Sequence, residues 1–329
     1  MRRLAIIGSG AWGTALAVVA WRAGSRPILW TRNREIAAAV NDRHENPLLL
    51  PGIALDPSIA ATTDFDLAVA GADAALLVVP AQSLRGVLAA HCHHLPSGLP
   101  RLHCAKGIES GSLATMSGVG SEILPASPFA VLSGPTFAAE VARDLPTAVA
   151  IAGHDPALAR AFMTALGSPR FRPYLSSDPI GAQIGGAVKN VVAIACGIIV
   201  GCGLGENARA ALITRGLAEM VRLGLALGAR NETFQGLSGF GDLVLTCTAL
   251  QSRNYMLGMA LGGGQSLGSA MAGRRLVVEG VATAVAVARL ASQLGLEMPI
   301  SAAVAAVLHD GAPIAAMIDR LLRRPYRSE

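Results

Sequence analysis

Two lysines stand out in this chain because nearly every other positive charge is an arginine. Of the 27 basic residues, only Lys106 and Lys189 are lysine. A lysine ammonium group can lose its proton when burial lowers its pKa, whereas an arginine guanidinium group stays charged. A position that keeps lysine in such a chain therefore suits proton transfer, and retention by chance is the alternative.

Lys189 lies within a strongly apolar helical pattern at residues 180–200. Burying an unpaired ammonium group is costly, so this side chain needs either a route to water along its stem or a buried partner. Asp242 follows two glycines and is the candidate acid. It has two possible tasks, which are pairing with Lys189 and accepting hydrogen bonds from substrate hydroxyl groups.

Lys106 lies just past the end of one predicted strand, and Gly134 and Thr136 lie in the small-residue turn that ends the next. Open α/β sheets bind ligands at the carboxyl ends of their strands, so these residues are expected to meet at one edge. Backbone amides after Gly134 and the hydroxyl group of Thr136 suit an anionic ligand. The two segments therefore predict part of a ligand site, and each alone is compatible with an ordinary loop.

Ser252, Arg253 and Asn254 place a fork-shaped cation between two hydrogen-bonding side chains. This combination suits a phosphate group. Further along, Glu279 supplies an acid that is able to bind an amide or hydroxyl group of a cofactor. These residues extend the candidate site into the second half of the chain.

A glycine-rich turn follows the first predicted strand. Gly8, Gly10 and Gly13 form the pattern G-x-G-x-x-G between an apolar strand at residues 4–7 and a helical pattern at residues 12–23. In dinucleotide-binding folds these glycines allow a tight turn, a close approach of the backbone to pyrophosphate, and close packing of helix on strand. The helix N-terminus also faces the phosphate charge. At the first junction of a strand–helix series, this pattern predicts a dinucleotide site.

The end of the second predicted strand bears on which dinucleotide binds. NAD sites usually place an acid there, about 20 residues after the glycines, to bind the ribose 2′-hydroxyl group. Here the tip of the strand at residues 28–30 carries no acid, and Arg32 and Arg34 follow it instead. Arginine suits a 2′-phosphate, so the pattern favours NADPH. Two solvated arginines at the start of a helix are the alternative.

Histidines and cysteines cluster at residues 91–94 and again at His103 and Cys104. Adjacent residues of one segment do not converge easily on a tetrahedral ion, and no spaced pair completes a zinc pattern. We therefore predict no metal site.

The elements that must position these residues change type along the chain. Short apolar, β-branched runs alternate with helical patterns in the first half, which predicts βαβ units and a parallel sheet covered on both faces. The predicted strands lie at residues 4–7, 28–30, 74–79, 101–104, 130–132 and 148–152. After about residue 179 only helical patterns follow, at residues 180–200, 208–227, 256–261, 281–294 and 300–308. The sequence thus predicts an α/β chain with a Rossmann-type parallel-sheet domain, residues 1–185, and an all-α domain, residues 186–329, with the ligand cleft between them.

Composition argues against several other classes of protein. Five cysteines without a C-x-x-C pair favour reduced thiols over a disulfide framework. The net charge of +5 is spread along the chain, which argues against nucleic acid as the main partner. The apolar run at residues 191–204 is shorter than the roughly 20 residues of a membrane helix, so we expect a buried helix and no stable membrane insertion. The N-terminal residues lack the pattern of a signal peptide, which favours the cytoplasm.

Taken in order, these motifs resemble those of the bacterial-type NAD(P)-dependent glycerol-3-phosphate dehydrogenases, nearly from end to end. The segments that carry the likeness are Gly8–Gly13, Lys106-Gly107-Ile108-Glu109, Leu132–Thr136, Lys189-Asn190, residues 203–207, 214–216 and 237–242, Ser252-Arg253-Asn254 and Val278-Glu279-Gly280. The resemblance implies reversible reduction of dihydroxyacetone phosphate to sn-glycerol 3-phosphate, the backbone of glycerophospholipids. It implies NADPH as the cofactor, with NADH as an alternative, and a homodimer.

The resemblance also implies a role for each matching residue. Lys189 is implied to protonate the substrate carbonyl oxygen, and Asp242 to orient the reacting end of the substrate. The other implied substrate contacts are Lys106, Gly134, Thr136, Ser252, Arg253 and Asn254. The implied cofactor contacts are Gly8, Gly10, Ala11, Trp12, Gly13, Arg32, Asn33, Lys106, Ala138, Arg253, Val277 and Glu279. Both lysines of the chain thus fall on family lysines, which favours function over chance.

Ala11 departs from the family pattern, because many relatives carry serine there. The missing hydroxyl group is expected to affect cofactor affinity more than activity. Two other functions stay open. Another hydroxyacid or ketopantoate-type reductase would share the glycine turn and a helix-borne lysine but would not need Ser252-Arg253-Asn254. A regulator that senses the cofactor without turnover would not need Lys189 and Asp242 together at a cleft.

Overall fold

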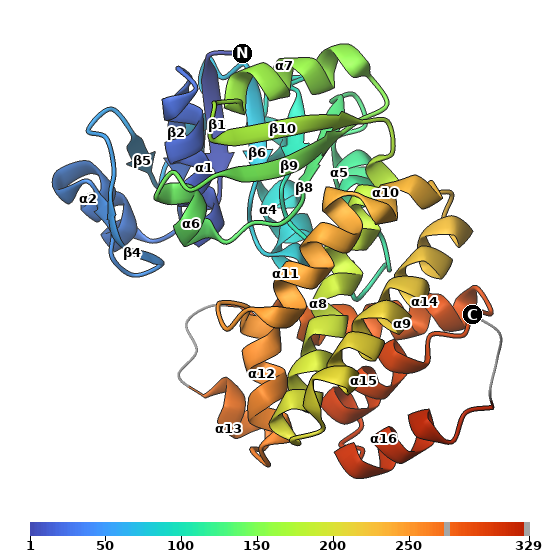
Figure 1. Ribbon diagram of the computed structural model, residues 1–329. Helices are drawn as coiled ribbons and strands as arrows, with labels where there is room; N and C mark the ends of the chain where they lie inside the picture. Colours follow the sequence, from blue (N-terminus) through green and yellow to red (C-terminus); the bar gives the residue numbers. More distant parts are fainter. Residues whose placement is uncertain (273–276, 326–329) are drawn as a thin grey trace.

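The computed structural model describes residues 1–272 and 277–325, in which an eight-stranded sheet precedes a group of helices (Figure 1). The order of strands across the sheet is β10-β9-β8-β7-β6-β1-β2-β5. Their bounds are β1 (Arg3–Ile7), β2 (Arg26–Trp30), β5 (Ala60–Thr62), β6 (Ala74–Leu77), β7 (Arg101–His103), β8 (Phe129–Ser133), β9 (Thr147–Ala152) and β10 (Phe171–Ser176). Each predicted strand forms, and β5 and β10 are additional strands that the sequence patterns did not predict.

The sheet departs from the predicted parallel arrangement at β9. The strands from β5 to β8 pair in parallel, whereas β9 is antiparallel to β8, with Val131 opposite Ala152, and β10 is parallel to β9. The connection from β8 to β9 contains only the five-residue helix α6 (Ala138–Ala142). A parallel return needs a longer crossover that carries the chain back to the amino end of the sheet. The prediction of a Rossmann-type parallel sheet is confirmed for most of its strands, and the predicted parallel direction was wrong for β9, the strand expected at residues 148–152.

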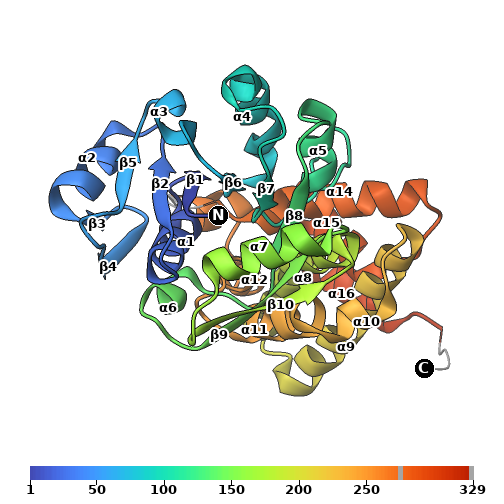
Figure 2. The same ribbon diagram turned by 90° about the horizontal axis from the view of Figure 1, so that it is seen from above.

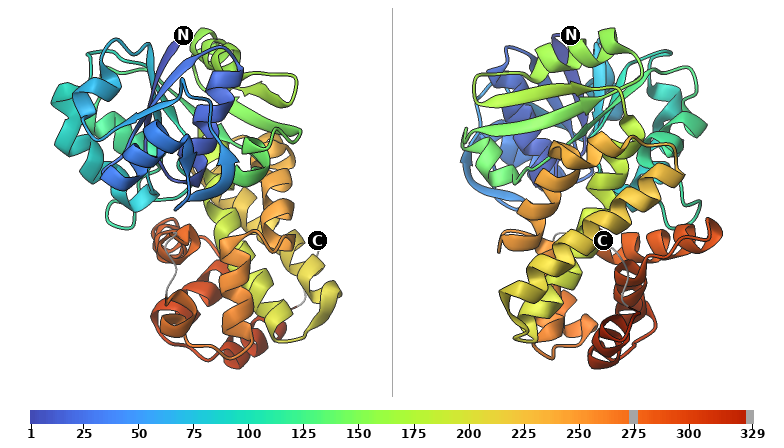
Figure 3. Two further views of the ribbon diagram at one scale, coloured as in Figure 1. Left: turned by 90° about the vertical axis from the view of Figure 1, so that its left-hand side faces the viewer. Right: turned by 45° about the vertical axis from the view of Figure 1, so that its right-hand side comes forward.

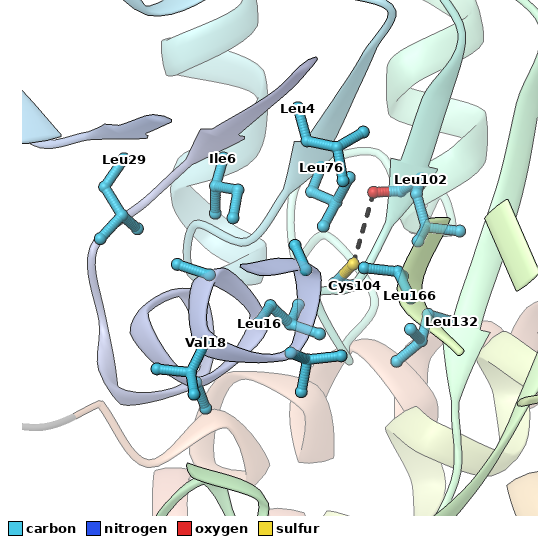
Figure 4. Packing of buried hydrophobic residues seen from close by; sticks show 14 of the residues in the cluster. Leu4, Ile6, Leu16, Val18, Leu29, Leu76, Leu102, Cys104, Leu132 and Leu166 are labelled. Carbon is cyan, nitrogen blue, oxygen red and sulfur yellow. Dashed lines mark hydrogen bonds between the residues drawn. The ribbon is translucent and has the colours of Figure 1, made fainter. Parts of the chain in front are cut away.

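Helices cover both faces of this sheet (Figure 2). Consecutive side chains of a strand point to opposite faces, so Leu4 and Ile6 join one core while Ala5 and Ile7 join the other. The helices on the first face are α1 (Ala11–Arg22), α2 (Arg34–Arg43) and α7 (Pro156–Leu166). Those on the second face are α3 (Phe65–Val69), α4 (Leu84–His91) and α5 (Met116–Ile123). Figure 4 shows the first core, in which Leu16 of α1 lies against the leucine and isoleucine side chains of the strands.

A small hairpin, which the sequence patterns did not predict, stands apart from the main sheet. Its strands β3 (Glu45–Asn46) and β4 (Leu50–Ala54) pair with each other in antiparallel fashion. Leu48 and Leu49, between the two strands, pack against the same core as Ala11 and Trp12 at the start of α1. The hairpin therefore lies beside the turn that carries the glycine pattern.

The helical part of the chain is organised around α8 (Pro179–Gly201), which is buried along most of its length (Figure 3). Close approach of α12 to α8 depends on small residues, because a Cβ atom at Gly197 would lie 2.1 Å from the carbonyl oxygen of Tyr255. The elements around α8 are α9 (Gly205–Ala226), α10 (Asn231–Gln235), a π-helical turn (Leu237–Gly241), α11 (Asp242–Thr248), α12 (Arg253–Gly262), α13 (Leu267–Met271), α14 (Glu279–Gln293), α15 (Pro299–His309) and α16 (Ile314–Leu322). The prediction of an all-α second half is confirmed.

Helix α8 is long and apolar enough to cross a membrane by length and composition, but 83% of its most apolar stretch is buried within the protein. It is therefore a core helix, as the sequence predicted. The predicted domain boundary between residues 185 and 186 lies inside α8, whose early residue Ala182 packs against Val131 and Ala152 of the sheet. The division into residues 1–185 and 186–329 stays a prediction.

Candidate active site

A cleft of about 920 Å³ lies where the carboxyl ends of the strands meet helices α8, α12 and α14. This is the edge at which open α/β sheets bind their ligands. The predicted site residues that line it are Gly8, Gly10, Ala11, Trp12, Arg32, Asn33, Lys106, Thr136, Ala138, Lys189, Ser252, Arg253, Asn254, Val277 and Glu279. The three remaining predicted residues, Gly13, Gly134 and Asp242, lie behind this lining. Segments far apart in sequence thus form one surface.

Asp242 lies at the centre of the polar groups beneath the cleft. Its side chain is 0% exposed, and an ammonium group approaches each of its carboxylate oxygens. The Nζ atom of Lys189 lies 2.5 Å from Oδ1, and the Nζ atom of Lys106 lies 2.7 Å from Oδ2. Asp242 is therefore the buried partner of Lys189, which was the first of the two tasks considered for it. It pairs with the second lysine as well.

Lys189 is the more deeply buried of the two lysines, with 7% of its side chain exposed against 15% for Lys106. Burial disfavours the charged form and lowers the pKa of Lys189 to about 8, although the nearby carboxylate of Asp242 opposes this shift. Its Nζ atom also donates a hydrogen bond of 2.9 Å to Oγ1 of Thr246. A lysine with this pKa is able both to give and to take a proton near neutral pH.

Thr246 is a site residue that the sequence analysis missed. It lies four residues after Asp242 on α11, so both side chains share one helix face. Its hydroxyl group donates a 2.6 Å hydrogen bond to the carbonyl oxygen of Asp242 while it accepts from Lys189. The spacing of Asp242 and Thr246 was the available signal, but it has meaning only once the segment is known to be helical.

Two glycines allow Lys189 to reach this position. A Cβ atom at Gly185 would lie 2.1 Å from the carbonyl oxygen of Ser238, in the π-helical turn before Asp242. One at Gly186 would lie 2.9 Å from Oγ of Ser133. Side chains at residues 185 and 186 would therefore push α8 away from the turn and the sheet, and Lys189 away from its partner. The segment before Asp242, which contains two glycines, forms a π-helical turn.

Lys106 is held by the loop that follows the neighbouring strand. Its Nζ atom donates a 2.8 Å hydrogen bond to the carbonyl oxygen of Gly134 and lies 3.5 Å from Oγ1 of Thr136. Residues at the carboxyl ends of the neighbouring strands β7 and β8 thus meet at Lys106, as expected for residues at one edge of the sheet. Gly134 contributes through its backbone and itself lies below the surface of the cleft.

The three residues suited to phosphate form the start of α12. Ser252 is its N-cap, with Oγ accepting a hydrogen bond from the amide of Tyr255. The guanidinium group of Arg253 donates to the carbonyl oxygen of Val277 at 2.5 Å. The N-terminus of this ten-residue helix therefore faces the cleft with an arginine beside it, an arrangement that favours an anion.

Asn254 is engaged in a buried network of amide groups. Its Nδ2 atom donates to Oδ1 of Asn190 at 2.9 Å, and its Oδ1 atom accepts from the amide of Gly280 at 3.0 Å. These bonds join α8, α12 and α14 beside the cleft. Asn190, which also lines the cleft, is a second residue to which the sequence analysis assigned no separate role.

The glycine turn has the geometry that the sequence pattern predicted. Gly8 has a φ of +119°, and a Cβ atom at Gly13 would lie 1.8 Å from the carbonyl oxygen of Gly8. Nearby, Nε1 of Trp12 and Oε2 of Glu279 are buried and have no hydrogen-bond partner among the described residues. Because buried polar groups are normally paired, this lone donor and lone acceptor in the cleft lining suit a polar ligand such as a dinucleotide.

The two arginines after β2 differ in position. Arg32 lines the cleft, whereas Arg34 is the first residue of α2 and is not part of the lining. Asn33 caps α2, since its Oδ1 atom accepts hydrogen bonds from the amides of Glu35 and Ile36 at 2.8 and 3.3 Å. Only Arg32 of the two is therefore placed to contact a ligand in the cleft.

The clustered histidines at residues 91–94 are not part of the cleft lining, and they contact aromatic rings and a carboxylate. His91 stacks on Phe65 with ring centroids 4.2 Å apart, and Nδ1 of His94 lies 2.5 Å from Oδ1 of Asp66. His103 is buried beside Arg101. Within residues 1–272 and 277–325, no group of three or more potential ligands is arranged to hold a metal ion.

Two family models match consecutive parts of the chain. The N-terminal model of NAD-dependent glycerol-3-phosphate dehydrogenase covers residues 3–159, and the C-terminal model covers residues 178–319. The chain belongs to the NAD-dependent glycerol-3-phosphate dehydrogenase family. The resemblance drawn from its motifs is thereby confirmed.

Individual members of the glycerol-3-phosphate dehydrogenase family are similar over their full length. The glycerol-3-phosphate dehydrogenase [NAD(P)+] of Rhodospirillum rubrum is 56% identical, over 99% of this chain and 93% of that protein. The enzyme of Caulobacter vibrioides is 55% identical, over 99% and 98%. The crystal structure of glycerol-3-phosphate dehydrogenase from Coxiella burnetii has a TM-score of 0.94 at 37% identity, covering 98% of this chain and 99% of that one.

Family membership confirms three sequence-based predictions about the chemistry. The chain is an oxidoreductase that interconverts dihydroxyacetone phosphate and glycerol 3-phosphate, and its cofactor is a nicotinamide dinucleotide, NAD(P). Its substrate is thus a small phosphorylated molecule. The ketopantoate-type reductase and the non-catalytic regulator, which the sequence alone left open, are set aside.

Proposed function

We propose that Lys189 is the acid–base residue of this glycerol-3-phosphate dehydrogenase and that NADPH is its preferred reductant. The observation that carries the role of Lys189 is the pairing of Lys189 and Lys106 with the two oxygens of one buried carboxylate, Asp242. The reaction adds a hydride to the carbonyl carbon of dihydroxyacetone phosphate and a proton to its oxygen. The site must therefore hold the substrate and supply one proton.

Lys189 supplies that proton. In the direction of reduction its ammonium group donates a proton from Nζ to the carbonyl oxygen and becomes a neutral amine. In the direction of oxidation the neutral amine takes the proton of the substrate hydroxyl group. Because its pKa is lowered to about 8, both forms are accessible near neutral pH, and proton transfer of this kind contributes about 10²–10⁴-fold to the rate.

Asp242 acts through the two lysines, because it lies behind the cleft lining. Its Oδ1 atom fixes the position of Lys189, and its Oδ2 atom fixes that of Lys106. We assign to Lys106 a contact with both substrate and cofactor, supported by its place between the loops after β7 and β8. Two ammonium groups at this point also favour the negative charge that develops on the carbonyl oxygen.

The residues proposed to hold the dinucleotide surround the start of α1. Bound NADPH supplies the hydride from its nicotinamide ring. Gly10 and Ala11 offer backbone amides to the pyrophosphate, while Trp12 and Glu279 offer a donor and an acceptor that lack partners within the described residues. The amide of Gly8 donates to the carbonyl oxygen of Trp30, so Gly8 is proposed to contact the cofactor through the close approach of its backbone. The other proposed cofactor contacts are Gly13, Arg32, Asn33, Lys106, Ala138, Arg253 and Val277.

Preference for NADPH is proposed on the position of Arg32. Arg32 lines the cleft at the end of β2, where NAD sites usually have an acid. The described residues contain no ion pair that engages its guanidinium group. A free guanidinium group at this place suits the 2′-phosphate of NADPH, which NADH lacks.

The phosphate of the substrate is assigned to the start of α12. Ser252 and Arg253 lie at the N-terminus of this helix, and Asn254 is fixed beside them by its bonds to Asn190 and Gly280. The helix dipole and the guanidinium group both favour a dianion. Thr136, which lines the cleft, and Gly134, which lies below its surface, complete the proposed substrate contacts.

The decisive experiment measures NADPH oxidation with dihydroxyacetone phosphate by the parent protein and by Lys189→Met and Lys189→Arg variants. We expect turnover by the parent and a loss of at least about 10²-fold in both variants, with NADPH binding retained. Arginine keeps the charge but does not release a proton, so it separates proton transfer from charge. Undiminished turnover by either variant contradicts the role of Lys189.

We further propose a homodimer in the cytoplasm, without stable membrane insertion, and two domains that meet within α8. Light scattering after size-exclusion chromatography measures the mass of the assembly, and a single-chain mass contradicts the dimer. Cell fractionation tests the compartment, and recovery in the membrane fraction contradicts the proposed absence of insertion.

A further inference from the structure

Asn46 is buried beside the glycine turn, with 0% of its surface exposed. It belongs to β3 of the small hairpin and has no contact with the reacting end of the site. Its amide group bonds to the start of the glycine turn and helix α1 on one side and to the loop between β3 and β4 on the other. Its Nδ2 atom donates to the carbonyl oxygen of Ser9 at 2.9 Å and to Oγ1 of Thr14 at 2.8 Å, and its Oδ1 atom accepts from the amide of Leu49 at 3.2 Å.

The carbonyl group of Ser9 is the important partner. It also accepts a 3.2 Å hydrogen bond from Oγ1 of Thr14, so two donors hold it inside the protein. The peptide bond between Ser9 and Gly10 is trans, and the C=O and N–H groups of a trans peptide point in opposite directions. Anchoring the Ser9 oxygen inward therefore turns the amide of Gly10 outward, toward the cleft that Gly10 lines.

The oxygen of the same amide group contacts a second part of the cleft wall, the loop of the small hairpin. By accepting from Leu49, Asn46 fixes the loop between β3 and β4. Leu48 and Leu49 of this loop and Leu50 at the start of β4 line the cleft, and Leu48 and Leu49 pack against the same core as Ala11 and Trp12. One buried side chain thus sets the relative position of the pyrophosphate turn and the leucine wall beside it.

We propose that Asn46 is a positioning residue for the dinucleotide, which orients the Gly10 amide and the leucine wall before the cofactor binds. This proposal rests on the proposed cofactor site. Because the pyrophosphate is common to NADPH and NADH, loss of this positioning weakens the binding of both cofactors equally. The rate of the chemical step at saturating cofactor does not depend on it.

The test compares Asn46→Asp with the parent protein. Aspartate has the same shape but replaces the donor by an oxygen that faces the Ser9 oxygen, and a buried group left without its partner typically costs enough for about a tenfold effect. We expect the Kd and KM for NADPH and for NADH to rise about tenfold each, with kcat and the KM for dihydroxyacetone phosphate unchanged within about twofold. Fluorescence titration and initial rates measure these constants.

A second pair of variants, at Thr14, tests the same contacts if Asn46→Asp does not fold. Thr14→Val removes the hydroxyl group that donates to the Ser9 oxygen and accepts from Asn46, and Thr14→Ser keeps it. We expect Thr14→Val to weaken both cofactors and Thr14→Ser to bind as the parent does. Unchanged cofactor affinity in both Asn46→Asp and Thr14→Val overturns the proposal, as does a loss for NADPH alone or a loss confined to kcat.

Asn41 provides a control for the loss of backbone hydrogen bonds. It donates to the carbonyl oxygen of Ala61 and accepts from the amide of Ala61, at 2.8 Å each, but unlike Asn46 it is exposed and is not part of the cleft lining. Asn41→Asp is expected to lower thermal stability without changing either cofactor Kd. An equal loss of affinity in this control shows a general structural effect and also overturns the proposal. Absence of NAD(P)H turnover in the parent protein is a separate result, which contradicts the proposed function itself.

Discussion

The Nζ atom of Lys189 lies 2.5 Å from Oδ1 of Asp242, although 53 positions separate the two residues in sequence. Both side chains are buried, so two opposing effects act on the charge of Lys189. Attraction to the carboxylate favours the ammonium form of Lys189, while desolvation disfavours it more strongly. This balance leaves a lysine whose proton is available near neutral pH.

The first prediction concerns the pH dependence of the two directions of reaction. Reduction needs protonated Lys189, so kcat/KM for dihydroxyacetone phosphate is expected to be constant at low pH and to fall as pH rises through about 8. Oxidation of glycerol 3-phosphate needs the neutral amine, so its rate is expected to rise with pH and level off above the same value. Initial rates over a pH series check this, and profiles that move together contradict it.

The second prediction concerns the influence of Asp242 on that profile. The carboxylate raises the pKa of Lys189 against desolvation, so Asp242→Asn is expected to lower it further. The falling limb of the reductive profile then moves to lower pH. A limb that stays in place, measured on folded variant protein, shows that Asp242 does not control the charge of Lys189.

The third prediction concerns stability. Asp242→Asn leaves two ammonium groups without their anionic partner, and breaking a buried ion pair typically costs about 3–5 kcal/mol. The control is Glu206, whose side chain is 70% exposed and pairs with Arg209, because Glu206→Gln is expected to cost about 0–1 kcal/mol. Urea unfolding measures both changes. Similar small losses would mean that the buried pairs contribute little to the free energy of unfolding.

The fourth prediction concerns cofactor choice. Arg32→Ala is expected to raise the KM for NADPH about tenfold or more, as is typical when a charge-assisted hydrogen bond is lost, and to leave the KM for NADH almost unchanged. Arg34→Ala is the matched control, because Arg34 is not part of the cleft lining, and it should change neither constant. Equal effects of Arg32→Ala on both cofactors show that this residue does not bind the 2′-phosphate.

The fifth prediction concerns Ala11, where many relatives carry serine. Ala11 lines the cleft at the first position of α1, so a hydroxyl group added there would face the cofactor. Ala11→Ser is expected to lower the Kd for NADPH severalfold, which corresponds to one added hydrogen bond, with little change in kcat. Fluorescence titration measures the Kd. A weaker or unchanged affinity indicates that the backbone amides of the turn suffice.

Local sequence patterns predicted the elements that depend on short-range periodicity. Alternation of apolar runs and helical patterns located the six strands and the change to helices, because burial on one or both faces imposes a period on neighbouring residues. The same patterns missed β5 and β10. They also missed the reversal of β9, because strand direction depends on the path of the connection around the sheet. They also missed the hairpin that contains Asn46, whose strands are too short to show a period.

The sequence by itself determined which residues are available for chemistry. Two lysines in an arginine-rich chain, a glycine pattern after the first strand, and a missing acid after the second are properties of residue type and local spacing, and no distant part of the chain alters them. The tertiary structure alone decided that Lys106 and Lys189 share one carboxylate, that Thr246 completes the site, and that Arg32 lines the cleft while Arg34 does not. These contacts join segments far apart in sequence, and only the packing of α8 and α11 against the edge of the sheet sets the distances between them.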